Sequence, residues 1–202
     1  MQTKEFQIVA RIERLGPGKA FSAKDFLDLA SRTMIDVTLA KLARSGKIRR
    51  LRRGLYDLPK FNPSLGGRLS PDIDEAAGAI ARRQRWKIVP EGAWAANLLG
   101  LSTQVPSKIV YLTDGPNKEV PIGRRSIQFK HARPKALAGL EGKLALVVQA
   151  LRHLGKGGVG EREIEMLRAA LSPAEKRKLV RDTRFGVDWI YEVAKRIAEK
   201  AA

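Results

Sequence analysis

A short run of basic residues carries the clearest potential chemistry in this sequence. Five cations fall within seven residues: Lys47, Arg49, Arg50, Arg52 and Arg53. Guanidinium and ammonium groups bind phosphate oxygens through charge-assisted hydrogen bonds. A charge run is often only a solvated surface, but this one lies in two strand-like segments, 47–51 and 55–58, with Gly54 in the turn between them. The pattern predicts a β-hairpin whose basic tip contacts a polyanion.

The charge of the whole chain points the same way. The 202 residues include 39 Lys and Arg against 21 Asp and Glu, which gives a formal net charge of +18. Residues 1–60 alone contain 14 of these basic residues and 6 of the acidic ones. A protein this basic usually meets a polyanion, because neutralising phosphates releases condensed counterions. Charge alone does not distinguish DNA from RNA.

Other chemistries find little support in the residues. The absence of cysteine excludes disulfides and thiolate metal sites. The glycine-rich segment 155–160 lacks the Gly-Lys-Ser/Thr ending of a phosphate loop and follows a helix, so an interhelical loop is favoured. Asp72 and Asp74 suit the dipole of a helix start better than a metal pair, and His131 has no evident co-ligands. We therefore expect no enzymatic activity, no metal and no cofactor.

The termini and apolar segments favour a cytoplasmic protein. The first 16 residues are amphipathic and lack the apolar core of a secretory signal. No apolar run approaches the ~20 residues that span a bilayer. We therefore expect no contact with a membrane.

The elements that would hold the basic run are predicted to be three helices. Apolar residues from Phe6 to Leu15 recur at helical spacing, and the helix ends at residues 16–18. Ser22 is placed to cap a short second helix, with Asp25 in its first turn. A turn at 30–33 leads to a third helix, which ends at residues 45–46. Its inward-facing residues are predicted to be Met34, Val37, Leu39, Leu42 and Ala43.

Two helices joined by a short turn and followed by a basic hairpin predict a winged helix-turn-helix over residues 1–60. The beginning of the third helix would face base edges, and Arg32 best matches guanine. Ser31 and Thr33 fit either a helix cap or a phosphate contact, and the two roles can coexist. The residues predicted to contact DNA are Ser31, Arg32, Thr33, Asp36, Lys41, Arg44, Lys47, Arg49, Arg50, Arg52 and Arg53.

Residues 61–202 are predicted to form a second domain. After a turn-rich linker, Ser70 and Pro71 suit the start of a helix over 72–85. A strand at 86–90, a helix at 92–99, and strands at 108–113, 119–122 and 125–130 are expected next. From residue 140 the pattern is helical, with a capping box at Ser172. The predicted fold class is α+β, with an N-terminal winged helix-turn-helix followed by a small α+β domain with a helical C-terminal tail.

Two motifs suggest a family. Residues 52–59 (RRGLYDLP) resemble the wing "RRGLY-x-LP" of AbiEi-family antitoxins, and residues 93–106 resemble that family's stretch ending in "LGLTxQVP". The resemblance covers about residues 5–155. It implies an antitoxin and autorepressor of a type IV toxin–antitoxin operon, with a winged helix that binds inverted repeats at its own promoter. It also implies wing contacts by Arg49, Arg50, Arg52 and Arg53, and a nucleotidyltransferase-like toxin as the partner of the second domain.

Two hypotheses therefore remain open at this point. The first is a sequence-specific repressor of double-stranded DNA that is also an antitoxin. The second is a basic protein that binds RNA or the nucleoid non-specifically, because residues 61–202 still carry +10 of the net charge of +18. The operator, the toxin and the oligomeric state are not predicted.

Overall fold

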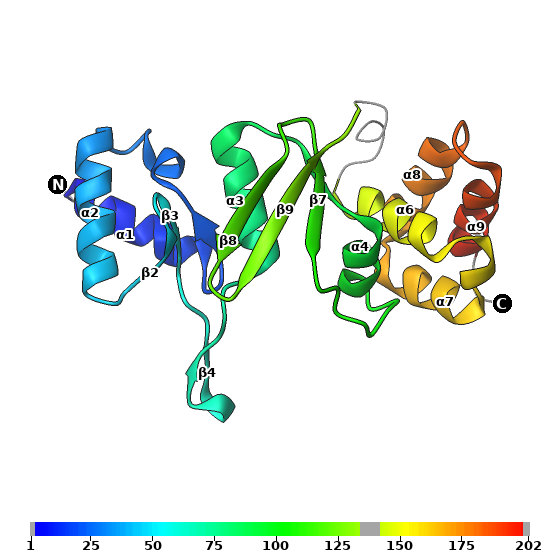
Figure 1. Ribbon diagram of the computed structural model, residues 1–202, viewed down its shortest axis with the longest axis horizontal. Coiled ribbons are helices and arrows are strands. Elements are labelled where there is room, and N and C mark those ends of the chain that lie inside the picture. Colours follow the sequence, from blue (N-terminus) through cyan, green and yellow to red (C-terminus); the bar gives the residue numbers. More distant parts are fainter. Residues whose placement is uncertain (1–2, 134–141, 200–202) are drawn as a thin grey trace. The chain divides into compact units, whose positions relative to one another are not determined.

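The computed structural model describes residues 3–133 and 142–199. The protein is a mixed α+β structure, as predicted (Figure 1). Its chain divides into two compact units. The first comprises Met1–Trp86 and Glu119–Ile127, and the second comprises Lys87–Lys118 and Gln128–Ala202. The first unit is thus longer than the predicted domain 1–60.

The first unit begins with helices and a small antiparallel sheet. Its elements in chain order are α1 (Lys4–Leu15), β1 (Ala20–Phe21), the 3-10 turn η1 (Ala23–Phe26), α2 (Arg32–Arg44), β2 (Arg49–Arg52) and β3 (Leu55–Asp57). The strand order is β1-β3-β2. The helices α1 and α2 and the β2–β3 hairpin lie where the sequence predicts them. The predicted second helix is only the 3-10 turn. Ser22 caps it as expected, and the structure adds that Asp25 completes a capping box with Ser22.

A single apolar cluster holds these elements together. It is built from Ile8 and Ile12 of α1, Phe21, Phe26, three residues of α2, and Ile48 and Tyr56 of the hairpin segment. The rings of Phe21 and Phe26 meet edge to face at 5.6 Å, a favourable geometry for aromatic pairs. The hairpin is therefore fixed to α2 through shared core residues.

The buried face of α2 differs from the prediction. Met34 and Val37 were expected to pack inward, but they are 39% and 64% exposed. The buried residues of this helix are Ile35, Thr38, Leu39 and Leu42. At 3.6 residues per turn these four positions form one stripe, and Met34 and Val37 lie on a neighbouring one. The apolar core excludes them because Ile35 and Leu39 already fill it, each with no exposed surface.

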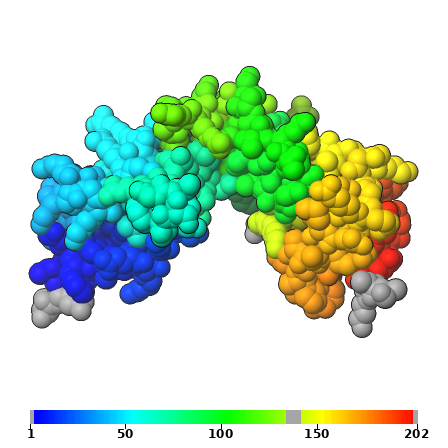
Figure 2. All heavy atoms as spheres, turned by 90° about the horizontal axis from the view of Figure 1, so that it is seen from below, coloured from blue at the N-terminus to red at the C-terminus, as the bar shows by residue number. Residues whose placement is uncertain are grey.

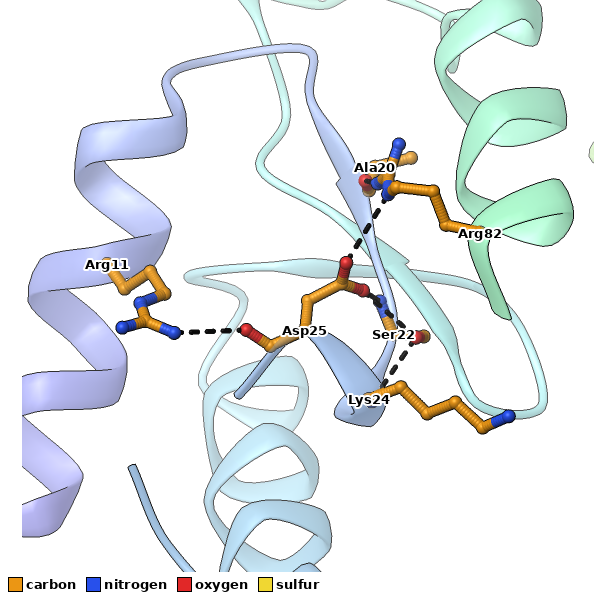
Figure 3. A network of polar contacts seen from close by, with 6 residues as sticks. All are labelled: Arg11, Ala20, Ser22, Lys24, Asp25 and Arg82. Atoms are coloured by element: carbon orange, nitrogen blue, oxygen red, sulfur yellow. Dashed lines mark hydrogen bonds and ion pairs between the residues drawn. The ribbon is translucent and has the colours of Figure 1, made fainter. Parts of the chain in front are cut away.

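The helix α3 (Ile73–Gln84) explains why the first unit extends past residue 60. Arg82 on α3 donates to the carbonyl oxygen of Ala20 at 2.9 Å and pairs with Asp25 at 3.4 Å (Figure 3). Lys24 donates to the carbonyl oxygen of Arg83 at 2.8 Å. These contacts connect α3 to β1 and η1. Ser70 was predicted to cap α3, but the cap is Asp72. Its carboxylate accepts hydrogen bonds from the backbone amides of Asp74 and Glu75 in the first turn of the helix.

The segment predicted as a linker forms a small hairpin. The strands β4 (Phe61–Asn62) and β5 (Gly67–Arg68) pair antiparallel around the 3-10 turn η2 (Pro63–Leu65). Its turn closes at Gly66, whose backbone φ of 60° lies in the left-handed region. The two strands position Arg68 beside the end of α2, as described below.

The remaining elements largely follow the prediction. They are β6 (Ile88–Pro90), α4 (Gly92–Leu98), β7 (Ile109–Thr113), β8 (Lys118–Ile122), β9 (Arg125–His131), α6 (Lys143–Leu154), η3 (Lys156–Gly158), α7 (Glu161–Ala170), α8 (Pro173–Thr183) and α9 (Asp188–Ala198). The strands form a sheet of order β6-β7-β9-β8. The C-terminal helices pack on an apolar cluster that includes Leu151, Ile164 and Leu179. The predicted capping box at Ser172 is present. In the described ranges no helix is long and apolar enough to cross a membrane.

The contact between α4 and α6 requires a glycine. A Cβ added at Gly92 would lie 2.5 Å from the Cβ of His153 and 2.9 Å from the carbonyl oxygen of Gln149. Because the second atom is helix backbone, α4 and α6 must separate to admit a methyl group. We expect Gly92→Ala to lower the free energy of unfolding by about 1–3 kcal/mol, although alanine is the better helix former. Urea unfolding followed by circular dichroism measures this change.

The matched control is Gly157→Ala, because a Cβ at Gly157 would meet nothing within 4 Å. This control should unfold at the wild-type urea concentration. Equal midpoints for Gly92→Ala and the wild type would contradict the close packing of α4 on α6.

Candidate nucleic-acid interface

The outward side of α2 carries five of the eleven predicted contact residues. Those exposed on it are Arg32, Thr33, Asp36, Lys41 and Arg44, together with the unexpected Met34 and Val37. Ser31 is the N-cap of α2, and its hydroxyl accepts from the amide of Met34 at 3.4 Å. Of the two roles that the sequence allowed for Ser31, a helix cap or a phosphate contact, the structure shows the cap. The helix presents a mixed polar and apolar surface rather than a purely charged one.

Arg32 is held in place by its own helix. Its Nε lies 2.8 Å from Oδ2 of Asp36, and both side chains are about half exposed, at 53% and 49%. An exposed pair at this spacing contributes little stability, about 0.3–0.5 kcal/mol. Within the described residues the two terminal nitrogens of Arg32 make no other hydrogen bond. Asp36 therefore orients the guanidinium and leaves its terminal fork open.

Lys41 and Arg44 differ in their surroundings. Lys41 pairs with Glu5 of α1 at 2.8 Å, which neutralises part of its charge. Arg44 is exposed in the last turn of α2 and has no ion-pair partner among the described residues. Arg44 is thus the more available cation at this end of the helix.

Arg49 belongs to the interior of the hairpin. Its Nε and Nη2 donate to the two carboxylate oxygens of Asp57 at 3.0 and 2.5 Å, and its Nη1 donates to the carbonyl oxygen of Leu69 at 2.8 Å. Asp57 is only 1% exposed and stands opposite Arg49 in the β2–β3 register. All three guanidinium nitrogens are engaged within the protein. Arg49 is therefore not among the side chains free to reach a phosphate.

The other four cations of the run have no carboxylate partner among the described residues. Lys47, Arg50 and Arg53 are exposed and Arg52 is half-buried, and none of these four side chains has an ion-pair partner in the described parts of the chain. Figure 2 shows atoms of α2 and of the β2–β3 hairpin at the surface of the first unit. Four uncompensated charges beside an exposed helix produce a locally positive surface that attracts phosphates.

The hairpin tip depends on Gly54 and Arg83. Gly54 has a φ of 73°, a left-handed conformation that is strained for residues with a side chain. Nη1 of Arg83 on α3 donates to the carbonyl oxygen of Arg53 at 3.3 Å. The helix α3 therefore stabilises the tip of the hairpin through this hydrogen bond. The local sequence of the hairpin does not reveal this contact.

The turn before α2 is tied to α1 by an ion pair. Nη1 and Nη2 of Arg11 bind the two oxygens of Asp28 at 2.6 and 2.8 Å. Nη1 of Arg11 also donates to the carbonyl oxygen of Asp25 at 3.2 Å (Figure 3). The hydrogen bonds from Arg11 hold the pKa of Asp28 below its ordinary value. Asp28 therefore stays ionised to a lower pH than an ordinary aspartate, and the ion pair links the turn before α2 to α1.

The amino-acid sequence matches a family of unknown function, DUF6088, over residues 7–179. The chain belongs to the DUF6088 family. No curated protein matches the sequence. Among solved structures, the protein is similar to the crystal structure of the RV2827C protein from Mycobacterium tuberculosis, with 18% sequence identity and a TM-score of 0.41. That similarity covers 98% of this chain and 77% of the other.

The remaining candidate groups of this DUF6088 protein have local roles. Asp72 caps α3, and Asp74 lies in its first turn. Nδ1 of His131 lies 2.9 Å from the carbonyl oxygen of Gly115, and His153 packs against Gly92. Within residues 3–133 and 142–199, no three His, Asp or Glu side chains are grouped so as to hold a metal ion. The surface formed by α2 and the hairpin is thus the principal candidate site.

Proposed function

We propose that this DUF6088 protein binds double-stranded DNA sequence-specifically and regulates transcription. The observation that carries the proposal is the exposed face of α2 next to four uncompensated cations of the β2–β3 hairpin. In this proposal α1, η1 and α2 form the helix-turn-helix, α2 enters the major groove, and the hairpin is the wing.

The composition of α2 suits the reading of base edges. An arginine fork matches the O6 and N7 acceptors of guanine, and an apolar side chain matches the methyl group of thymine. Arg32 and Val37 supply these two groups on the exposed side of one helix. Lys47, Arg50 and Arg53 would bind phosphates, which fixes the register of the helix without reading sequence.

RNA binding, the second hypothesis, has less support. Proteins that read single-stranded RNA on a sheet stack its bases on exposed aromatic residues. The aromatic residues on the larger sheet are Tyr111 and Phe129, which are 2% and 1% exposed, and their rings lie 6.1 Å apart. They fill the core and offer no stacking surface. A helix also fits the major groove of B-DNA better than the narrow one of A-form RNA.

We further propose an antitoxin role, on the resemblance of residues 93–106 to AbiEi antitoxins. The segment from α4 to Pro106 leaves Leu98 and Val105 exposed, at 38% and 59%, which suits a protein partner. Co-expression with a nucleotidyltransferase-like protein encoded beside this gene tests the role. Rescue of growth is expected, and continued toxicity would contradict it.

Fluorescence anisotropy tests the DNA-binding proposal directly. The labelled probes are the duplex upstream of the gene and a shuffled duplex of the same composition, both at 150 mM salt. Sequence-specific proteins typically bind their site ~10³-fold or more tightly than other DNA. Equal affinity for the two duplexes would contradict the proposal, and tighter binding of single-stranded RNA would favour the second hypothesis.

A prediction for Val37 tests the orientation of α2. In the mapped operator, each thymine is replaced in turn by deoxyuridine, which removes only the methyl group. At one position we expect wild-type affinity to fall about 3–4-fold, the value of one buried methyl group. The Val37→Ala variant should bind that duplex and its thymine parent almost equally. Val105→Ala, which removes an exposed valine of the second unit, should respond as the wild type does; an identical response by Val37→Ala would contradict the assignment.

A further inference from the structure

A basic cleft lies in the first unit beside the hairpin. It has a volume of about 530 Å³, and four arginines line it: Arg49, Arg68, Arg124 and Arg125. Arg124 lies in the turn between β8 and β9 and Arg125 begins β9, far along the chain from the β2–β3 hairpin. No carboxylate is among the residues that line the cleft. The local sequence around Arg124 and Arg125 gave no reason to assign them a site.

The four arginines are engaged to different degrees. Arg49 is bound by Asp57 and by the carbonyl oxygen of Leu69. Arg68 donates through Nη2 to the carbonyl oxygen of Gly46 at 2.8 Å. Arg124 and Arg125 are exposed and have no ion-pair partner within the described residues. Hydrogen bonds within the protein therefore hold Arg49 and Arg68 in place, and among the described residues only Arg49 of the four has a carboxylate partner.

The cleft adjoins the surface proposed to bind DNA. Gly46, which Arg68 contacts, precedes the exposed Lys47. The cleft therefore lies beside the C-terminal end of α2 and belongs to the same compact unit as the hairpin.

We propose that this cleft binds a phosphodiester segment of the duplex held by α2, so that the β8–β9 turn is a second contact to the DNA backbone. This inference rests on the proposed function. The guanidinium groups of Arg124 and Arg125 have no ion-pair partner among the described residues, and such groups select phosphate oxygens. The cleft lining contains no aromatic ring on which a free nucleotide base could stack. The exposure of Arg124 and Arg125 suits a large ligand that approaches from solvent.

The double variant Arg124→Ala/Arg125→Ala tests this contact in the full-length protein. Each lost phosphate contact reduces the salt slope of log K by ~0.9. Extrapolated from 1 M salt, two contacts correspond to about 30-fold in affinity at 0.15 M salt. We expect that loss on the operator and on the shuffled duplex alike, together with a shorter hydroxyl-radical footprint on one flank. The variant Arg124→Lys/Arg125→Lys, which keeps the charge, should recover most of the affinity.

The matched control is Arg177→Ala/Lys178→Ala, which removes two exposed cations from α8. Unchanged melting temperatures for both double variants establish that each is folded. If the wild type prefers the operator but Arg124→Ala/Arg125→Ala binds and footprints like the control, the cleft is not a DNA contact although the proposed function stands. If the wild type shows no preference for the operator, the proposed function itself fails. Thermal stabilisation by pyrophosphate that the variant loses, with unchanged duplex binding, would make the cleft a small-anion site and overturn the inference.

Discussion

Replacing Arg49 with alanine should lower the free energy of unfolding by about 3 kcal/mol, because it leaves a buried carboxylate without its partner. Asp57 is 1% exposed, and Arg49 satisfies both of its oxygens. The neighbouring Arg50 is exposed and unpaired within the described residues, so Arg50→Ala should change stability by less than about 0.5 kcal/mol. Chemical denaturation of the two variants measures the difference.

A further variant separates the loss of the pair from the loss of one partner. Replacing both residues, as in Arg49→Leu/Asp57→Leu, removes the buried charge together with its partner and should recover much of the lost stability. Equal stability of Arg49→Ala and Arg50→Ala would mean that the pair contributes nothing to the hairpin. In that case Arg49 would again be a candidate for contact with DNA.

Removing the three exposed cations of the hairpin should have the largest effect on binding. For Lys47→Ala/Arg50→Ala/Arg53→Ala we expect roughly 170-fold weaker binding of any duplex at 0.15 M salt, by the same extrapolation from 1 M salt, and a salt slope lower by nearly three units. The reason is that phosphate contacts contribute through counterion release and carry no sequence information. Titrations from 50 to 300 mM salt, on operator and shuffled duplexes, measure both quantities.

The expected ratio of operator to shuffled affinity is the more informative number. This ratio of affinities should be nearly unchanged in the triple variant, because α2, the helix proposed to contact the bases, is intact. Arg32→Ala should instead reduce the ratio while leaving binding to the shuffled duplex in place. If the triple variant lost its preference for the operator and kept its overall affinity, the roles assigned to the helix and the hairpin would be reversed.

Some features could be predicted from neighbouring residues alone. The helix cap at Ser22, the capping box at Ser172, the helix α1 and the strands β7 to β9 depend on interactions within a few residues, so composition and spacing suffice to predict them. The high positive charge and the basic hairpin run are likewise properties of the sequence itself.

Other features depend on packing between distant segments. Met34 and Val37 are apolar, and only the arrangement of α1, η1 and the hairpin around α2 leaves them exposed. The extension of the first unit past residue 60 depends on contacts such as that of Arg82 with Ala20, which are 62 residues apart. No local rule specifies such pairs, because many alternative partners satisfy the same polar groups.

The basic run of the hairpin shows both what the sequence determines and what only the tertiary structure decides. The sequence by itself determined that five cations would be concentrated near the tip of a β-hairpin. Only the tertiary structure distinguished Arg49, which neutralises the buried Asp57, from its exposed neighbours. Only the tertiary structure also brought Arg124 and Arg125 into one cleft with Arg68. The physical reason is that the charge of a side chain is a local property, whereas its burial and its partners are set by how the whole chain packs.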